Sequence, residues 1–202
     1  MKYSRALIVT LCSTAALAFP ASAQTQTPDF STRGFSLGGH AAVIGANPDS
    51  FGENGHRTDP EGLTAGGGGL IVAYGVNEWL SVALNGDGHE SEDDRDLTLA
   101  DIGVQFFLPA RGRVRPHLDV ALTGRRTEFT TTSRAIDTRG ASLSIGGGFL
   151  YFVSRSLAFD AALLWTRGDL DQYADGERVK DADPIGVSGT RFLIGVRWFP
   201  RR

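Results

Sequence analysis

Large hydrophobic residues alternate with small or polar ones in eight separate stretches of the chain. In one of them, Leu143 and Ile145 alternate with Ser142 and Ser144. A period of two places successive side chains on opposite faces of a β-strand. The pattern predicts strands near residues 35–45, 65–76, 79–87, 98–109, 115–127, 141–153, 157–166 and 190–199.

The two faces of these predicted strands differ in side-chain size. One face is rich in Leu, Ile, Val and Phe, whereas the other consists mostly of Gly, Ala, Ser and Thr with a few charged residues. Small side chains fit the narrow interior of an eight-stranded barrel, which rows of large apolar side chains would overfill. The large apolar rows should therefore face lipid. The sequence predicts an all-β fold, an eight-stranded antiparallel up-and-down transmembrane β-barrel.

The connections between the predicted strands alternate between short and long. The short connections are residues 76–78, 109–114 and 154–156, and the long polar ones are residues 46–62, 88–97, 128–140 and 168–189. Short periplasmic turns and long extracellular loops are typical of outer-membrane barrels. An even number of strands places both ends of the barrel on the periplasmic side.

Aromatic residues with the lipid-facing parity gather near the ends of the predicted strands. Such rings favour the headgroup level of a membrane. The predicted aromatic girdle consists of Phe35, Tyr74, Phe106, Tyr151, Phe159 and Trp198 near the short turns, and of Trp165 and Phe192 on the other side.

In this pattern the chain resembles the small eight-stranded outer-membrane barrels typified by the OmpA membrane domain and OmpX. The ending Gly195-Val196-Arg197-Trp198-Phe199 is similar to the closing strand of that family, although this chain continues through Pro200 to two arginines. The resemblance implies insertion by the barrel-assembly machinery into outer-membrane lipids and lipopolysaccharide.

The first residues predict export. Lys2 and Arg5 precede a short apolar run, and Ala21-Ser22-Ala23 offers a signal-peptidase site. We expect a cleaved signal peptide over residues 1–23, a periplasmic segment over 24–34 and the barrel over 35–202. Cleavage would remove the single Cys and two basic residues, making the net charge more negative than −3. This charge balance argues against a nucleic-acid partner.

Several charged and polar residues carry the inward parity. Inside a narrow lumen these groups require partners. The sequence therefore predicts a polar network that plugs the barrel, with Asp160 close to Arg197; a gated or proton-responsive pore that uses the histidines is the alternative. The predicted network consists of His40, Asn85, Asp101, Gln105, His117, Asp119, Arg125, Asp160, Arg191 and Arg197.

Motifs for catalysis or cofactor binding are weak. The glycine run 66–69 completes no phosphate-binding loop, so curvature of the strand explains it better. His89-Glu90-Ser91 has a hydrolase-like spacing but falls in a predicted acidic loop. The acidic loops could hold Ca²⁺, although a solvated loop fits them better. We predict no enzyme activity, cofactor or metal.

These observations favour a structural or surface-interaction protein, a plugged barrel that exposes its loops. A narrow barrel for small-solute transport or ligand binding is the second interpretation, and a soluble periplasmic lipocalin-like binder is the third.

Overall fold

The structure, a computed structural model, describes most of the predicted barrel. The described residues are 30–48, 51–53, 56–58, 63–91, 95–110, 112–131, 134–174, 177–178 and 185–200. The predicted signal peptide lies outside them. No helix among the described residues is long and apolar enough to cross a membrane.

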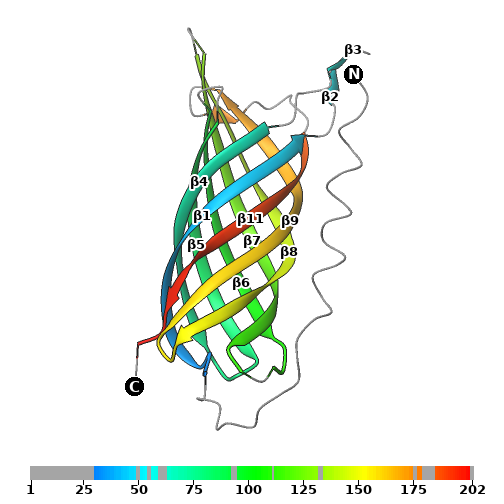
Figure 1. Cartoon of the computed structure of the whole chain (residues 1–202). Helices are drawn as coiled ribbons and strands as arrows, with labels where there is room; N and C mark the ends of the chain where they lie inside the picture. Colours follow the sequence, from blue (N-terminus) through cyan, green and yellow to red (C-terminus); the bar gives the residue numbers. More distant parts are fainter. Residues whose placement is uncertain are drawn as a thin grey trace, which may run out of the picture.

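Eight long strands form one closed antiparallel barrel (Figure 1). Each strand pairs with the next long strand in the chain, and β11 pairs with both β9 and β1, which closes the sheet. The predicted fold class is therefore confirmed. The long strands are β1 (Gly34–Pro48), β4 (Leu63–Gly75), β5 (Leu80–Ser91), β6 (Arg95–Phe107), β7 (Val114–Thr131), β8 (Arg134–Ser154), β9 (Leu157–Ala174) and β11 (Ile185–Trp198).

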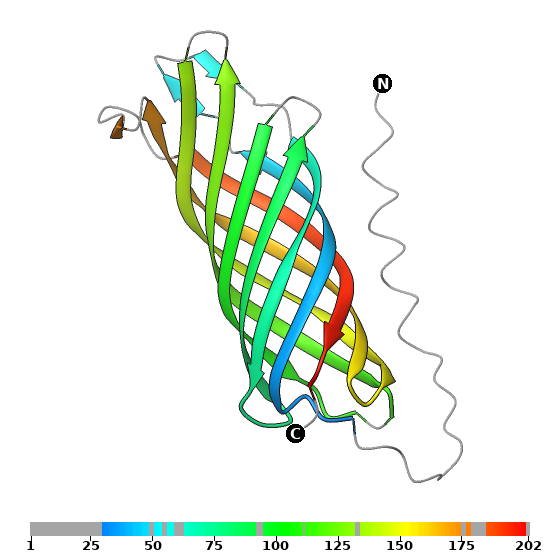
Figure 2. The same ribbon diagram turned by 90° about the vertical axis from the view of Figure 1, so that its left-hand side faces the viewer.

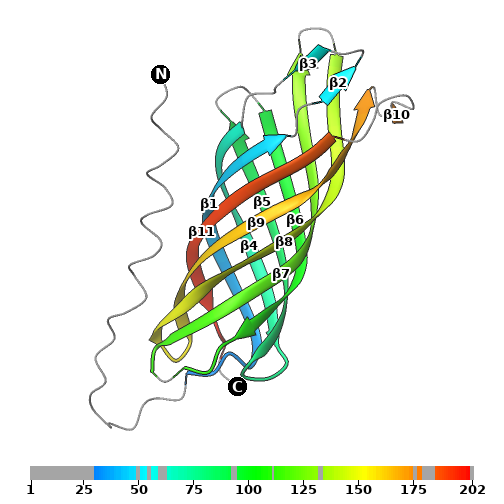
Figure 3. The ribbon, with the colours of Figure 1, turned by 90° about the vertical axis from the view of Figure 1, so that its right-hand side faces the viewer.

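Three short strands complete the described elements. Strands β2 (Phe51–Glu53) and β3 (His56–Thr58) pair with each other, and β10 (Glu177–Arg178) pairs with β9. They lie at the end of the barrel opposite the short turns (Figure 3).

The large apolar side chains face outward, as the size difference between the two faces predicts. Leu84, Ile102 and Leu122 are direct neighbours across three strands, and their exposed fractions are 53%, 56% and 62%. Their chain neighbours on the other parity, such as Asp101 and Thr123, are buried. The strands cross the barrel obliquely (Figure 2), as closure of an eight-stranded barrel requires.

One end of the barrel carries the short turns. There the chain connects β4 to β5, β6 to β7 and β8 to β9, and β1 begins and β11 ends at the same level (Figures 1 and 3). Gly112 lies in the β6–β7 turn with φ of 89°, a conformation that side chains with a Cβ rarely adopt. We refer to this as the short-turn end, and to the opposite one as the long-loop end.

Several strands extend further toward the long-loop end than predicted. Residues 88–97 and 128–140, expected as loops, lie largely in strands, because β5 continues to Ser91 and β8 begins at Arg134. Two features explain the error. Outward residues such as Glu90 and Asp96 lie beyond the apolar belt and resemble loop residues, whereas the Thr-rich end of β7 favours continued pairing.

Candidate functional site

The barrel lumen contains a polar cluster around Arg191 of β11, whose side chain is almost fully buried. Its Nη1 donates to Oδ2 of Asp87 at 2.7 Å, and its Nη2 donates to Oδ2 of Asp101. His40 Nε2 lies 2.5 Å from the other oxygen of Asp87, and Asn85 donates to Asp101 at 3.0 Å. Residues from β1, β5, β6 and β11 therefore meet across the lumen. We call this group the Arg191 cluster.

A second polar cluster surrounds Arg197, nearer the short-turn end. Arg197 donates to Asp160 and, at 2.7 Å, to Oε1 of Gln105. Gln105 in turn donates to Asp119 at 2.9 Å, and His117 Nδ1 lies 3.0 Å from the other oxygen of Asp119. His117 Nε2 is also 3.4 Å from Asp160, so the five residues form a ring. We call it the Arg197 cluster; it contains the predicted Asp160–Arg197 pair.

A small cavity of about 70 Å³ lies between these clusters. Residues of both clusters line it, among them His40, Asp101, His117 and Asp160. Oδ1 of Asp101 and Oδ1 of Asp160 are buried and accept no hydrogen bond within the described part of the chain. A space of this size suits a few water molecules, which would satisfy these oxygens.

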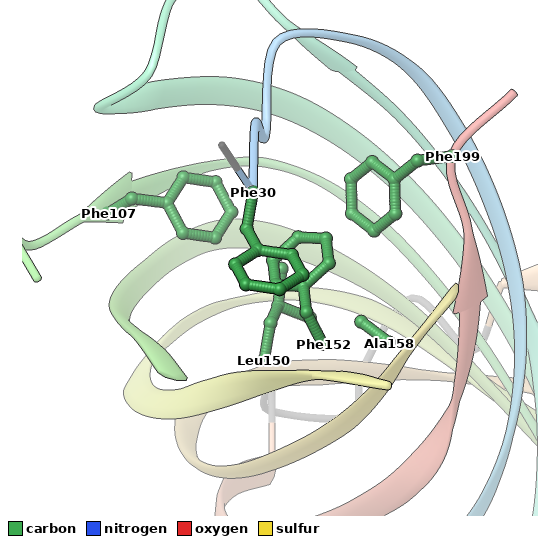
Figure 4. Packing of buried hydrophobic residues seen from close by; sticks show 6 residues of the cluster. All are labelled: Phe30, Phe107, Leu150, Phe152, Ala158 and Phe199. Carbon is green, nitrogen blue, oxygen red and sulfur yellow. The ribbon is translucent and has the colours of Figure 1, made fainter. Parts of the chain in front are cut away.

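An apolar layer blocks the short-turn end of the lumen (Figure 4). The ring of Phe30 packs against that of Phe152 with 5.4 Å between centroids, and Phe152 packs against Phe199 at 5.2 Å. Aromatic pairs at such separations stabilise a fold beyond the area they bury. We call this layer the aromatic plug; it comprises Phe30, Phe107, Leu150, Phe152, Ala158 and Phe199.

The segment before β1 crosses this end of the barrel and is held there by hydrogen bonds. Glu78, in the β4–β5 turn, accepts hydrogen bonds from the hydroxyl of Ser31 at 2.6 Å and from the backbone N–H of Thr32 at 3.2 Å. Arg115 donates from Nη2 to the carbonyl oxygen of Phe30 at 2.8 Å. These bonds hold Phe30 in the plug. We call residues 30–33 the N-terminal strap.

Two further apolar groups lie on the long-loop side of the Arg191 cluster. The first comprises Ile44, Ala65, Leu97 and Leu99, and the second comprises Ala46, Leu170 and Val187. From the short-turn end upward, the lumen therefore holds an aromatic layer, two charged clusters and an apolar layer.

The structure places all ten predicted network residues on the inward face, but it does not join them all. Nine belong to the two clusters, whereas Arg125 belongs to neither. Asp87 has the same inward parity as Asn85 in the predicted strand 79–87. The predicted network nevertheless omits it, although it binds both Arg191 and His40. The N-terminal strap, and with it the place of Phe30 in the aromatic plug, was also missed, because residues 30–33 show no strand alternation to indicate where they lie.

All eight predicted girdle residues lie on the outward face. Their exposed fractions range from 38% for Phe106 to 53% for Phe159. The register places four of them together near the short-turn end, since Phe35 pairs with Tyr74 and Tyr151 pairs with Phe159. Trp79, in the β4–β5 turn, is a further exposed aromatic residue at that end.

The hydrolase-like triplet does not lie in a loop. His89 is inside β5 and is buried in the lumen, whereas Glu90 faces outward. Alternation along the strand thus separates the two side chains. Among the described residues, no group of three or more His, Cys, Asp or Glu could hold a metal ion.

The same architecture occurs in solved structures. Similar ones include Neisserial surface protein A, with a TM-score of 0.63, 15% identity and coverage of 81% of this chain and 96% of that one. For OprG from Pseudomonas aeruginosa the TM-score is 0.53 and the identity 12%, with coverage of 83% of this chain and 97% of that one. For Ail, the attachment invasion locus protein of Yersinia pestis, the TM-score is 0.54 and the identity 13%, with coverage of 82% of this chain and 98% of that one.

At these identities the solved structures establish a shared fold, and no curated protein matches the chain. Residues 10–198 match the family model of the outer membrane protein beta-barrel domain. The chain therefore belongs to the outer membrane protein β-barrel domain family.

Proposed function

We propose that this protein is a plugged outer-membrane barrel with a structural or surface-interaction role, exerted through the loops at its long-loop end. In this proposal residues 1–23 are removed during export. The barrel-assembly machinery then inserts the chain, and outer-membrane lipids and lipopolysaccharide surround its apolar belt.

The filled lumen is the observation that carries the proposal. Arg191 and Arg197 each bridge strands on different sides of the barrel, and the aromatic plug lies between them and the short-turn end. The cavity between the two charged clusters, about 70 Å³, is sized for water rather than for a solute in transit. A barrel of this kind is better suited to hold loops in place than to conduct solutes.

The surface role draws support from barrels of the same fold. Two of the solved structures are named a surface protein and an attachment invasion locus protein. Those names describe those proteins. For this chain they favour the loops as the functional part, because a rigid barrel with a blocked centre leaves the loops as its variable element.

The first test is conductance in a planar lipid bilayer, preceded by outer-membrane fractionation and heat-modifiable gel migration to establish insertion and folding. We expect the wild-type barrel to fractionate with the outer membrane and to show no ion conductance. Steady single-channel steps from the wild-type protein would contradict the plugged barrel and favour the narrow transport barrel.

The second test separates the structural role from surface interaction. A strain lacking the protein would be complemented with the wild-type chain or with a variant whose β1–β4 and β9–β11 connections are shortened. Envelope permeability to a large antibiotic and adhesion to a coated surface would both be measured. If both chains return the envelope permeability of the deletion strain to the wild-type level, the barrel has the structural role. If the variant with shortened loops does not restore adhesion, the loops have the surface-interaction role. If the deletion changes neither property, the proposal is wrong.

A further inference from the structure

Arg125, on the inward face of β7, is a buried cation without a partner among the described residues. Only 9% of the residue is exposed, and its buried Nε has no acceptor in that part of the chain. Within the described part of the chain its guanidinium makes no hydrogen bond or ion pair. The other two buried lumen arginines, Arg191 and Arg197, both bind carboxylates. Arg125 is thus the exception among them.

The direct sheet neighbours of Arg125 carry no polar side chain. Its direct neighbours in the sheet are Leu99 on β6 and Gly140 on β8, and Gly140 in turn pairs with Leu170 on β9. Because Gly140 has no side chain, nothing from β8 stands between Arg125 and Leu170 at this level. Leu99 and Leu170 belong to the two apolar groups on the long-loop side of the Arg191 cluster.

A second unpartnered polar group lies beside Arg125. Thr127 is two residues further along the same face of β7, is 3% exposed, and its buried Oγ1 has no hydrogen-bond partner among the described residues. Its sheet neighbours are Leu97 on β6, which is apolar, and Thr138 on β8. The nearest inward carboxylates toward the lumen centre, Asp87 and Asp101, both bind Arg191 and are not available to Arg125.

Physical chemistry indicates which ligand such a site would take. A guanidinium stays protonated in proteins, and a buried charge without a partner costs several kcal/mol. An anion removes that cost, and the planar fork of Arg matches the two oxygens of a carboxylate. A single cation balances one negative charge, so a monovalent carboxylate fits better than a doubly charged phosphate. The leucines around it favour an anion that carries an apolar body.

We propose that Arg125 and Thr127 bind the carboxylate of a small organic anion, whose apolar body packs against Leu97, Leu99 and Leu170. The site lies between the Arg191 cluster and the long-loop end. A ligand would enter from the long-loop end and stop at the charged cluster. The site therefore serves binding and not passage through the barrel.

The probe for this site is benzoate, compared with benzyl alcohol, benzylamine and acetate. The full barrel would be placed in lipid nanodiscs, and binding would be followed by the NMR shifts of the backbone amides of Gly124, Thr127 and Gly140. We expect saturable shifts with benzoate, and affinities at least about tenfold weaker for the three comparison compounds, since each lacks the charge or the apolar body.

Three variants test the residues. Arg125→Gln should weaken benzoate binding at least about tenfold, while removing an unpaired buried charge should leave the empty barrel as resistant to urea as the wild type or more so. Leu170→Ala should weaken benzoate binding but not acetate binding. Arg155→Gln, in the exposed β8–β9 turn, is the matched control and should bind benzoate like the wild type.

Each other outcome overturns the proposal. Absence of saturable shifts with benzoate would mean that water alone satisfies Arg125. Equal binding of benzoate and acetate would mean that the arginine attracts anions without an apolar site. Unchanged benzoate binding by Arg125→Gln, or a large loss of stability in the ligand-free variant, would assign Arg125 a structural role.

Discussion

Arg191 of β11 and Asp87 of β5 form a buried ion pair across the lumen, with 2.7 Å between Nη1 and Oδ2. Two strands, β1 and β4, separate their strands around the barrel. The pair therefore connects parts of the sheet that no backbone ladder joins directly. Asp101 shares the same guanidinium, so one cation balances two carboxylates.

The first prediction concerns this shared cation. Arg191→Met would leave Asp87 and Asp101 buried without their counterion, and we expect the free energy of unfolding to fall by about 3–5 kcal/mol. Urea unfolding in lipid vesicles measures the change. Adding Asp87→Asn and Asp101→Asn to the variant should restore most of the loss, because the uncompensated charges disappear. A stability of Arg191→Met equal to that of the control Arg155→Met would contradict the assigned role.

The face of each lumen residue could be predicted from the sequence, whereas its partners could not. Alternation fixes whether Asp101 or Ile102 points inward, since the period of a strand is two. Alternation does not fix which residues lie opposite each other across the lumen. The register of the strands determines this, and it brings Arg191 to Asp87 rather than to another carboxylate. Asp87 also precedes Gly88, where the sequence predicted a loop. Because β5 continues past Gly88, Asp87 lies inside a strand, and its role as a partner of Arg191 is seen only in the structure.

The same limit explains why the sequence predicted neither the position of the N-terminal strap nor the isolation of Arg125 from the two clusters. Phe30 lies in a segment without strand periodicity, so no local pattern indicates that its ring enters the barrel mouth. Arg125 was expected in the network because its parity is inward. Its neighbours Leu99 and Gly140 come from strands β6 and β8, and only their register shows that no carboxylate of the described residues lies directly beside it.

The second prediction compares two glycines on neighbouring strands. A Cβ at Gly69 would lie 2.1 Å from the backbone oxygen of Gly86 and 2.9 Å from Cα of Asp87, whereas one at Gly86 would contact nothing within 4 Å. Gly69→Ala should therefore force the backbone apart and lower the free energy of unfolding by about 1–3 kcal/mol. Gly86→Ala should leave stability unchanged or raise it slightly. Equal urea midpoints for the two variants would contradict the close approach at Gly69.

The third prediction concerns the attachment of the strap. Glu78→Ala removes the acceptor for Ser31 and for the N–H of Thr32, and bonds to a charged acceptor are the stronger kind. We expect trypsin to cleave after the exposed Arg33 about tenfold faster in the folded variant. Glu90→Ala, which removes an exposed carboxylate at the opposite end of β5, is the matched control. A cleavage rate like that of the wild type would show that Arg115 and Phe30 hold the strap without Glu78.

The fourth prediction treats the barriers of the lumen as acting in series. Phe30→Ala removes a ring of the aromatic plug, and we expect it to lower the free energy of unfolding by about 3–5 kcal/mol. The variant should still conduct no ions in a planar bilayer, because the Arg197 and Arg191 clusters lie above the plug. Conductance should appear only when Arg191→Ala and Arg197→Ala are added, since either charged cluster alone spans the narrow lumen. If Phe30→Ala conducts by itself, the aromatic plug is the main barrier and the charged clusters leave a continuous path for ions.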